Sequence, residues 1–186
     1  MIRHLPNILT LARIAAVPAV VAMLFVPGET GRFWALVIFL IASITDFFDG
    51  WLARRLKMQS RFGTMLDPIA DKLLVAAVLV MLIPRGTVQG IDIIAILLIL
   101  GREIFISGLR EFMAGERVAL KVTLLAKWKT TIQMLAIVAL LAFGETGGTG
   151  EIAARAALWL AAALSLWTGA QYTVAAMKPP RTDIRA

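Results

Sequence analysis

The sequence contains no cysteine and only one histidine among its 186 residues. The absence of cysteine excludes disulfides and thiolate metal sites. His4 has no acidic neighbour in the sequence that could orient its ring, which argues against a catalytic role. Acidic residues are also few, 12 against 19 lysines and arginines, so the formal net charge is +7. No stretch interleaves aromatic with basic residues, and we therefore expect anionic lipid rather than nucleic acid to balance this charge.

Apolar residues dominate the chain instead, at 60% of the sequence with a mean hydropathy of +0.84. A soluble domain of ordinary composition has about 45–50% apolar residues. The apolar residues form continuous blocks of about 20 residues, long enough to cross a bilayer as helices and unlike the short alternating segments of a barrel. We therefore predict an all-α integral membrane protein with one domain and six transmembrane helices. These helices are expected at about residues 5–26, 33–56, 65–84, 91–113, 122–143 and 152–177.

Lysine and arginine are distributed unevenly between the two ends of the predicted helices. If the N-terminus lies in the cytoplasm, the outer turns hold only Arg32, Arg85 and Arg155, whereas the other basic residues lie at the inner ends or within helices. The positive-inside rule then places both termini in the cytoplasm. No cleavage site separates the first apolar block from the rest, so we expect that block to remain as a helix.

Four aspartates interrupt the apolar sequence between the second and third blocks: Asp46, Asp49, Asp67 and Asp71. An acidic group at membrane depth is costly and usually faces a bundle interior or a wet cavity. Helical spacing puts the first two on one face of the second helix and the last two on one face of the third. Because the two helices are joined by a short loop, these faces can meet and bring three or four carboxylates together.

Carboxylates this close cannot all stay ionised without a cation between them. Ligands that are all oxygen favour Mg²⁺ or Mn²⁺, and four carboxylates could hold two ions roughly 3.5–4 Å apart, which suits displacement at phosphorus. Gly50 and Ala53 leave the helix face beside the carboxylates open, and Gly63 allows the loop to bend before the third helix. Arg54 lies at the rim, where it could pair with a phosphate or a pyrimidine edge.

Two other interpretations of the aspartates stay open at this point. The aspartates could form buried ion pairs with Arg54, Arg55 and Lys72 that hold helices together, or they could line the ion site of a divalent-cation transporter. The transporter, however, gives no role to Gly50, Arg54 or Gly63.

The spacing Asp-x2-Asp-Gly-x2-Ala-Arg-x8-Gly-x3-Asp-x3-Asp is the signature of the CDP-alcohol phosphotransferases, and residues 46–71 resemble it at all eight fixed positions. The resemblance implies a six-helix membrane enzyme, usually a homodimer, whose site opens to the cytoplasm. Such enzymes transfer a phosphatidyl or related group from a CDP-linked donor to an alcohol and release CMP. The resemblance also implies metal ligation by the four aspartates and makes Asp71 the base that takes the proton of the acceptor hydroxyl. The residues implied for the CDP pocket are Gly50, Ala53, Arg54, Ser60 and Gly63.

Basic residues within the fourth and fifth predicted helices bear on the acceptor alcohol. Basic side chains beside a catalytic cavity suit an acceptor that carries its own phosphate, and Arg102, Arg110 and Lys127 are the candidates for binding it. Lys129 points well away from Lys127 on a helix, so at most one of these two lysines should reach deep into the site. We favour Lys127.

The segments 6–13, 101–111 and 127–133 resemble the phosphatidylglycerophosphate synthases within the family. This resemblance implies CDP-diacylglycerol as the donor and sn-glycerol 3-phosphate as the acceptor. It further implies a multi-pass protein of the bacterial cytoplasmic (inner) membrane, in contact with membrane lipids. Inositol phosphate, serine and phosphatidylglycerol remain alternative acceptors.

Overall fold

The structure is a computed structural model that describes residues 5–56, 61–116 and 124–177, except for the side chains of residues 5–9, 46–56, 61–65, 67, 68, 124 and 127. All regular structure in these residues is helical. The helices are α1 (Leu5–Phe25), α2 (Gly28–Leu56), α3 (Arg61–Met81), α4 (Asp92–Gly115), α5 (Leu124–Phe143) and α6 (Gly148–Ala176). Each helix overlaps most of the apolar block predicted for it, although α3 ends at Met81, three residues before the predicted end. The largest difference is the start of α2, five residues earlier than predicted, because its first turn is polar and lies outside the apolar block.

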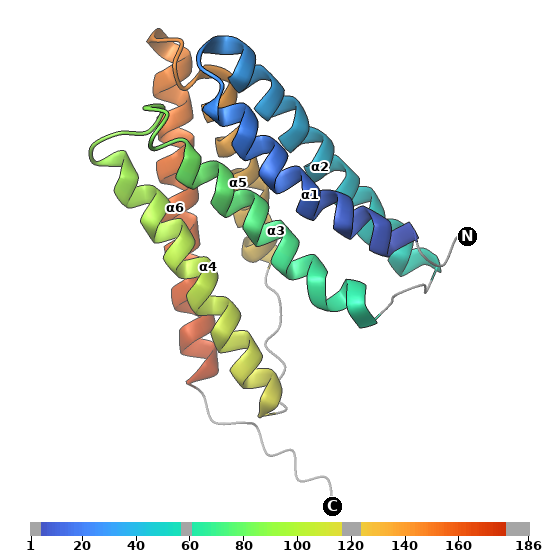
Figure 1. Cartoon of the computed structure of the whole chain (residues 1–186). Coiled ribbons are helices and arrows are strands. Elements are labelled where there is room, and N and C mark those ends of the chain that lie inside the picture. The colour runs from blue at the N-terminus through green and yellow to red at the C-terminus, as the bar shows by residue number, and fades with distance from the viewer. Residues whose placement is uncertain (1–4, 57–60, 117–123, 178–186) are drawn as a thin grey trace, which may run out of the picture.

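The six helices run alternately up and down the bundle (Figure 1). The connections at residues 26–27, 82–91 and 144–147 therefore lie at one end, which we call the turn end. The last residues of α2 and the first of α3 lie at the opposite end, which we call the signature end. Helix α1 packs against α2 and α3, while α6 packs against α4 and α5. Contacts between α2 and α5 join these two groups of helices.

The core of the bundle is apolar and fully buried. Each of the helices α2 to α6 contributes at least one large side chain to it, among them Phe39, Leu79, Ile99, Ile137 and Leu158. Helix α6 contributes mainly small residues to this core, among them Ala154, Ala161 and Ala162, which allow the neighbouring backbones to approach closely. Many large apolar side chains also lie on the outer surface. Ile104 is 75% exposed and Trp167 is 63% exposed. An apolar outer surface is normal for helices that face lipid.

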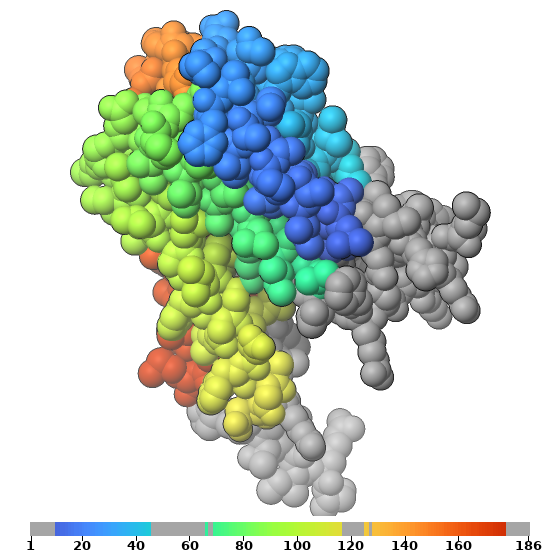
Figure 2. Space-filling view, viewed as in Figure 1, coloured from blue at the N-terminus to red at the C-terminus, as the bar shows by residue number. Residues whose placement is uncertain are grey.

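The surface of α1, α3 and α4 fills much of one face of the molecule (Figure 2). By length and composition alone, two of the described helical segments could cross a membrane, Gly28–Thr45 and Gly148–Ala176. Two further apolar segments, Thr10–Phe25 and Trp128–Phe143, are shorter. The helix composition fits a membrane protein, while the six spans and the cytoplasmic position of both termini stay predictions.

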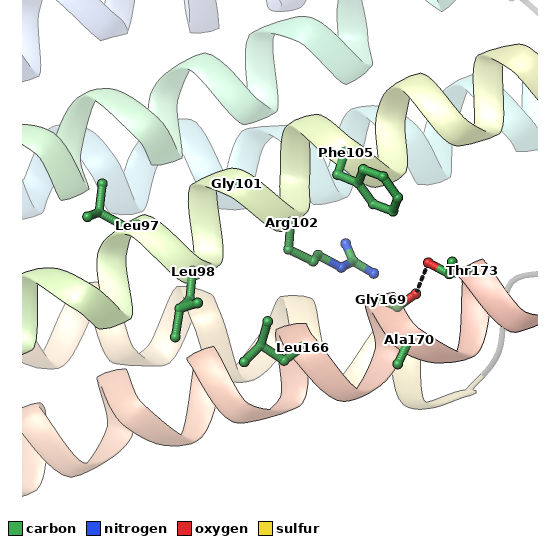
Figure 3. Close-up of a pocket in the computed structure, with 9 residues that line it drawn as sticks. All are labelled: Leu97, Leu98, Gly101, Arg102, Phe105, Leu166, Gly169, Ala170 and Thr173. Carbon is green, nitrogen blue, oxygen red and sulfur yellow. Dashed lines mark hydrogen bonds between the residues drawn. The ribbon is translucent and has the colours of Figure 1, made fainter.

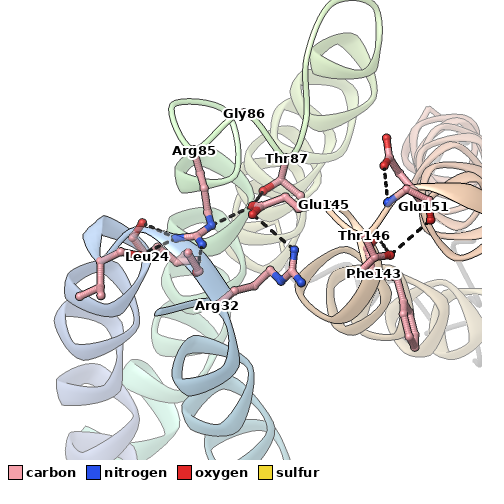
Figure 4. Close-up of polar contacts among 12 residues, drawn as sticks. Leu24, Arg32, Arg85, Gly86, Thr87, Phe143, Glu145, Thr146 and Glu151 are labelled. Atoms are coloured by element: carbon pink, nitrogen blue, oxygen red, sulfur yellow. Dashed lines mark hydrogen bonds and ion pairs between the residues drawn. The ribbon is translucent and has the colours of Figure 1, made fainter. Parts of the chain in front are cut away.

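The turn end is fastened by Arg85 and Glu145 (Figure 4). The Arg85 side chain is 6% exposed, and its Nε donates to Glu145 Oε1 at 2.8 Å. Its Nη atoms donate to the carbonyls of Leu24, Val26 and Gly28, at 3.0, 2.9 and 2.5 Å. These carbonyls lie at and just beyond the C-terminal end of α1, where backbone acceptors lack helical partners and a cation is stabilising. Arg85 thus ties the α3–α4 connection to the α1–α2 connection.

Glu145 completes this network from the α5–α6 connection. Its carboxylate accepts a hydrogen bond from the Thr87 hydroxyl and pairs with Arg32 Nη1 at 3.3 Å. Burial alone would raise the pKa of Glu145, but the hydrogen bonds from Thr87 and Arg85, with the charges of Arg85 and Arg32, outweigh it and lower the pKa below its ordinary value. Gly144 permits the close approach, because a Cβ there would overlap the Thr87 side chain.

Candidate functional site

The signature residues lie on the last turns of α2 and the first turns of α3. Helix α2 carries Asp46, Asp49, Gly50, Ala53 and Arg54, and α3 carries Gly63, Asp67 and Asp71. The expectation that Gly63 bends the loop before the third helix is wrong, because α3 already begins at Arg61. Ser60 lies outside the described residues, and among the signature residues only Asp71 has a described side chain. The described side chains contain no group of three or more potential metal ligands, but three of the four aspartates are not among them. Convergence of the four carboxylates therefore stays a prediction.

Asp71 is held by an arginine from α1. Arg13 Nη1 donates to Asp71 Oδ1 at 2.9 Å, and the side chain of Arg13 is only 4% exposed whereas that of Asp71 is 42% exposed. Thr10, one turn earlier on α1, is buried on the same face. The site therefore includes α1 as well as α2 and α3. Sequence reasoning did not include Arg13 in the site, although an arginine at membrane depth is itself a signal of function.

The residue after Asp71 connects α3 to α4. Lys72 Nζ donates to Ser107 Oγ, and Ser107 in turn donates to the carbonyl of Glu103 at 2.5 Å. The ammonium of Lys72 is also close enough to Asp71, Arg102 and Arg110 for their charges to act on it. The basic residues of α4 thus belong to the same electrostatic environment as Asp71.

Glu103 links α4 to α5. Its carboxylate accepts from Lys129 Nζ and from Arg102 Nη1, the latter at 3.2 Å. Arg102 continues the network to α6, since its Nη2 donates to Thr168 Oγ1 at 3.2 Å and its guanidinium lies over the Tyr172 ring at 6.0 Å from the centroid. One carboxylate therefore serves two cations, and with Lys72 nearby this cluster carries a net positive charge.

Lys129, which we did not favour from the sequence, is the lysine of α5 whose described side chain lies inside the bundle. Its side chain is 5% exposed and points into the bundle, and Gln133, one turn further along α5, is buried as well. The side chain of Lys127 is outside the described part of the chain, so its role stays a prediction. The roles of Arg102 and Arg110 in binding the acceptor also stay predictions, and Arg110 is exposed on α4. The phase of α5 could have identified Lys129, because its inner face continues through Ile137 and Leu140 at helical spacing.

The family model for CDP-alcohol phosphatidyltransferase matches residues 3–167 of this chain. Among curated proteins, the chain is similar to CDP-diacylglycerol–glycerol-3-phosphate 3-phosphatidyltransferases. The protein of Rickettsia bellii is 44% identical over 178 residues, which cover 94% of this chain and 96% of that protein. The protein of Haemophilus influenzae is 44% identical over 171 residues, 91% of each chain. The protein of Cereibacter sphaeroides is 50% identical over 134 residues, 72% of this chain and 61% of the relative.

Proposed function

Because the chain belongs to the CDP-alcohol phosphatidyltransferase family, we propose that it transfers the phosphatidyl group of CDP-diacylglycerol to sn-glycerol 3-phosphate, giving phosphatidylglycerophosphate and CMP. The observation that carries this proposal is the 44% identity to a glycerol-3-phosphate phosphatidyltransferase over 94% of the chain. A match of this extent includes α4 and α5, where the candidate acceptor residues lie, and not only the signature at residues 46–71.

Members of the family generally depend on divalent metal ions, and the donor set of this chain fits such ions. The signature offers only carboxylate oxygens, and the single described member of the set, Asp71, has a partly exposed side chain at the signature end. Oxygen donors without thiolate or imidazole suit Mg²⁺ or Mn²⁺. Asp46, Asp49, Asp67 and Asp71 would hold two such ions. Bound there, the ions would neutralise the charge of the donor diphosphate and of the departing CMP.

The protein's own groups would then position the reactants and move one proton. Asp71 takes the proton of the acceptor's C1 hydroxyl, and the resulting oxygen attacks the β-phosphorus of the donor. Arg13 fixes the orientation of the Asp71 carboxylate through their 2.9 Å bond. The CDP portion would be bound by the signature residues Gly50, Ala53, Arg54, Ser60 and Gly63.

The acceptor phosphate would be bound by Arg102, Arg110 and Lys127, to which the structure adds Lys129 as a candidate. The excess of cations over carboxylates around Glu103 supports an anionic acceptor, because a phosphate would balance it. A neutral acceptor such as serine would leave this charge unbalanced.

The test is CMP release by the purified protein with CDP-diacylglycerol and Mg²⁺, measured with and without glycerol 3-phosphate. We expect release that depends on glycerol 3-phosphate and falls to background when inositol phosphate, serine or phosphatidylglycerol replaces it. Release that depends on one of those alcohols would reassign the acceptor. Metal uptake into sealed vesicles without any nucleotide, in the absence of CMP release, would favour the transporter.

The proposed setting is the bacterial cytoplasmic membrane, with a homodimer of six-span subunits and the signature end facing the cytoplasm. The absence of native cysteine makes the orientation directly testable, since a single introduced thiol is the only one present. Thr149→Cys at the turn end should react with a membrane-impermeant maleimide in spheroplasts. Glu111→Cys at the signature end should react only after the membrane is opened. The reverse pattern would invert the proposed topology.

A further inference from the structure

A groove of about 420 Å³ runs along the seam between α4 and α6 (Figure 3). Its walls are mainly apolar, and three of the wall residues, Leu97, Phe105 and Leu166, are 61, 56 and 47% exposed on the outer surface. The volume falls within the range of roughly 300–1,000 Å³ that small-molecule sites occupy. On a bundle set in a membrane, this groove opens toward lipid.

Small residues create the groove. A Cβ added to Gly101 of α4 would meet nothing within 4 Å, so the space beside it is open. On α6, a Cβ at Gly169 would lie 3.1 Å from Arg102 Cγ, so the arginine stem rests directly on the α6 backbone. One end of the groove is therefore lined by the Arg102 side chain, while the part beside Gly101 stays free for a ligand.

The two ends of the groove differ in polarity. Helices α4 and α6 run in the same direction, so Leu97 and Leu166 lie toward the middle of the bundle and Arg102 lies toward the signature end. Arg102 is the one charged residue in the described lining, and its Nε is buried without a hydrogen-bond partner among the described residues. Glu103 must balance both Arg102 and Lys129, which leaves this end of the groove positive.

The dimensions favour a thin, extended occupant. The groove extends from Leu97 to Phe105, about 12 Å along a helix, so its mean cross-section is roughly 35 Å². A transmembrane helix about 10 Å wide needs about 80 Å². A single acyl chain fits within this cross-section, whereas a helix from a second copy could only lie across the rim of the groove.

We propose that the α4–α6 groove binds one acyl chain of an anionic membrane phospholipid, whose phosphate lies at the positive end near Arg102. This lipid is a resident ligand of the outer surface and is distinct from the donor bound by the signature. The proposal shares with the proposed function the membrane setting and Arg102, which is also a candidate for binding the acceptor phosphate.

The test compares two matched glycine substitutions on α4. Gly101→Leu fills the groove, and Gly108→Leu adds the same side chain at an exposed position whose Cβ also meets nothing within 4 Å and which is not part of the lining. Both changes raise helix propensity equally. The lipids retained by each purified protein would be counted by native mass spectrometry after titration with dioleoyl phosphatidylglycerol or dioleoyl phosphatidylcholine.

We expect wild type and Gly108→Leu to retain one tightly bound phosphatidylglycerol per chain, bound more tightly than phosphatidylcholine. The affinity for it should fall about tenfold in Gly101→Leu, the effect of losing contact with about two methylenes. Equal retention by all three proteins, or equal loss in both variants, would overturn the site. Equal binding of the two lipids would overturn its anionic character. If Gly101→Leu changed the oligomeric state without changing lipid retention, the groove would be assigned to a second copy of the chain.

Turnover, measured separately as CMP release, keeps this proposal apart from the proposed function. An inactive wild type with the expected lipid pattern would disprove only the transferase. An active wild type whose lipid is unaffected by Gly101→Leu would disprove only the groove.

Discussion

The two ends of the bundle contain the same types of charged residue but differ in how their charges are balanced. At the turn end, Arg85 donates to one carboxylate and three backbone carbonyls, and Glu145 contacts two arginines and a threonine. At the signature end, Glu103 faces two cations and Asp71 stays partly exposed beside buried Arg13. The described ion pairs of the turn end join three arginines to three carboxylates, because Arg155 also pairs with Asp92 and Glu151. Those of the signature end join three cations to two carboxylates, so this end is left with a positive excess.

This difference indicates that the turn end contributes mainly to the stability of the fold and the signature end mainly to activity. A network whose donors and acceptors are matched holds the three connections together and has no need of a ligand. A buried cluster with an excess of one charge is unfavourable by itself and becomes balanced when an anion binds. We therefore expect substitutions at the turn end to change mainly the free energy of unfolding, and those at the signature end to change mainly turnover.

The largest expected effect is that of Asp71→Asn. The amide cannot take the acceptor proton, so CMP release should fall by about 10³-fold or more, while the melting temperature changes little. The matched control at the turn end is Asp92→Asn, which loses its charge beside Arg155 and keeps an oxygen near Trp159. This control should keep the turnover of the wild type. Full activity in Asp71→Asn would show that another group acts as the base.

The next effect is that of Arg85→Ala on stability. Removing a side chain that is 6% exposed leaves Glu145 and three carbonyls without its hydrogen bonds, and we expect a loss of about 3 kcal/mol in the free energy of unfolding. Denaturation in mixed micelles, followed by tryptophan fluorescence, would measure it. CMP release per folded molecule should remain unchanged.

Arg155→Ala is the control for this loss. Arg155 also pairs with carboxylates at the turn end, those of Asp92 and Glu151, but its side chain is 42% exposed. Its removal should therefore reduce the free energy of unfolding by about 1 kcal/mol or less. Equal losses in the two variants would contradict the special role of Arg85.

Lys129→Met tests the signature end more finely. The variant removes one cation from Glu103 and keeps the side-chain length, so we expect kcat/KM for glycerol 3-phosphate to fall about 10- to 100-fold. The KM for CDP-diacylglycerol should change little. Lys127→Met is the comparison. Because Lys129 is the lysine that points into the bundle, we expect kcat/KM to fall less in Lys127→Met than in Lys129→Met. A larger loss in Lys127→Met would instead support the prediction made from the sequence.

The sequence predicted the helices well because each helix requires one continuous apolar block. The predicted boundaries are wrong where a helix extends beyond its apolar block or ends before it. Polar residues at the start of α2 concealed its first turn. The signature spacing likewise predicts a site at Asp71 from one segment that holds all eight positions, and this stays a prediction. The partners of these residues were harder to predict. Arg13 and Asp71 are 58 residues apart, and Glu103 and Lys129 are 26 apart. Such pairs depend on how each helix is rotated about its axis.

The smallest expected effect is the contribution of Glu145 to stability as the pH changes. Because the pKa of Glu145 in the folded protein lies below its ordinary value, its charge stabilises the fold fully above that ordinary value, about 4.5, and the contribution is lost as the pH falls through the folded pKa. Wild type should therefore be more stable than Glu145→Gln at pH 7, by about 1 kcal/mol, and the difference should shrink below pH 4.5.

Comparing these two proteins at each pH removes the titration of the signature aspartates, which both share. Thermal unfolding in detergent between pH 7 and pH 4 is the measurement. A stability difference that stays constant over this range would mean that the contacts of Glu145 with Thr87, Arg85 and Arg32 do not depend on its charge, and that the turn end is held by geometry alone. A difference that disappears on acidification would show that its matched charges contribute to stability, in contrast to the positive excess at the signature end.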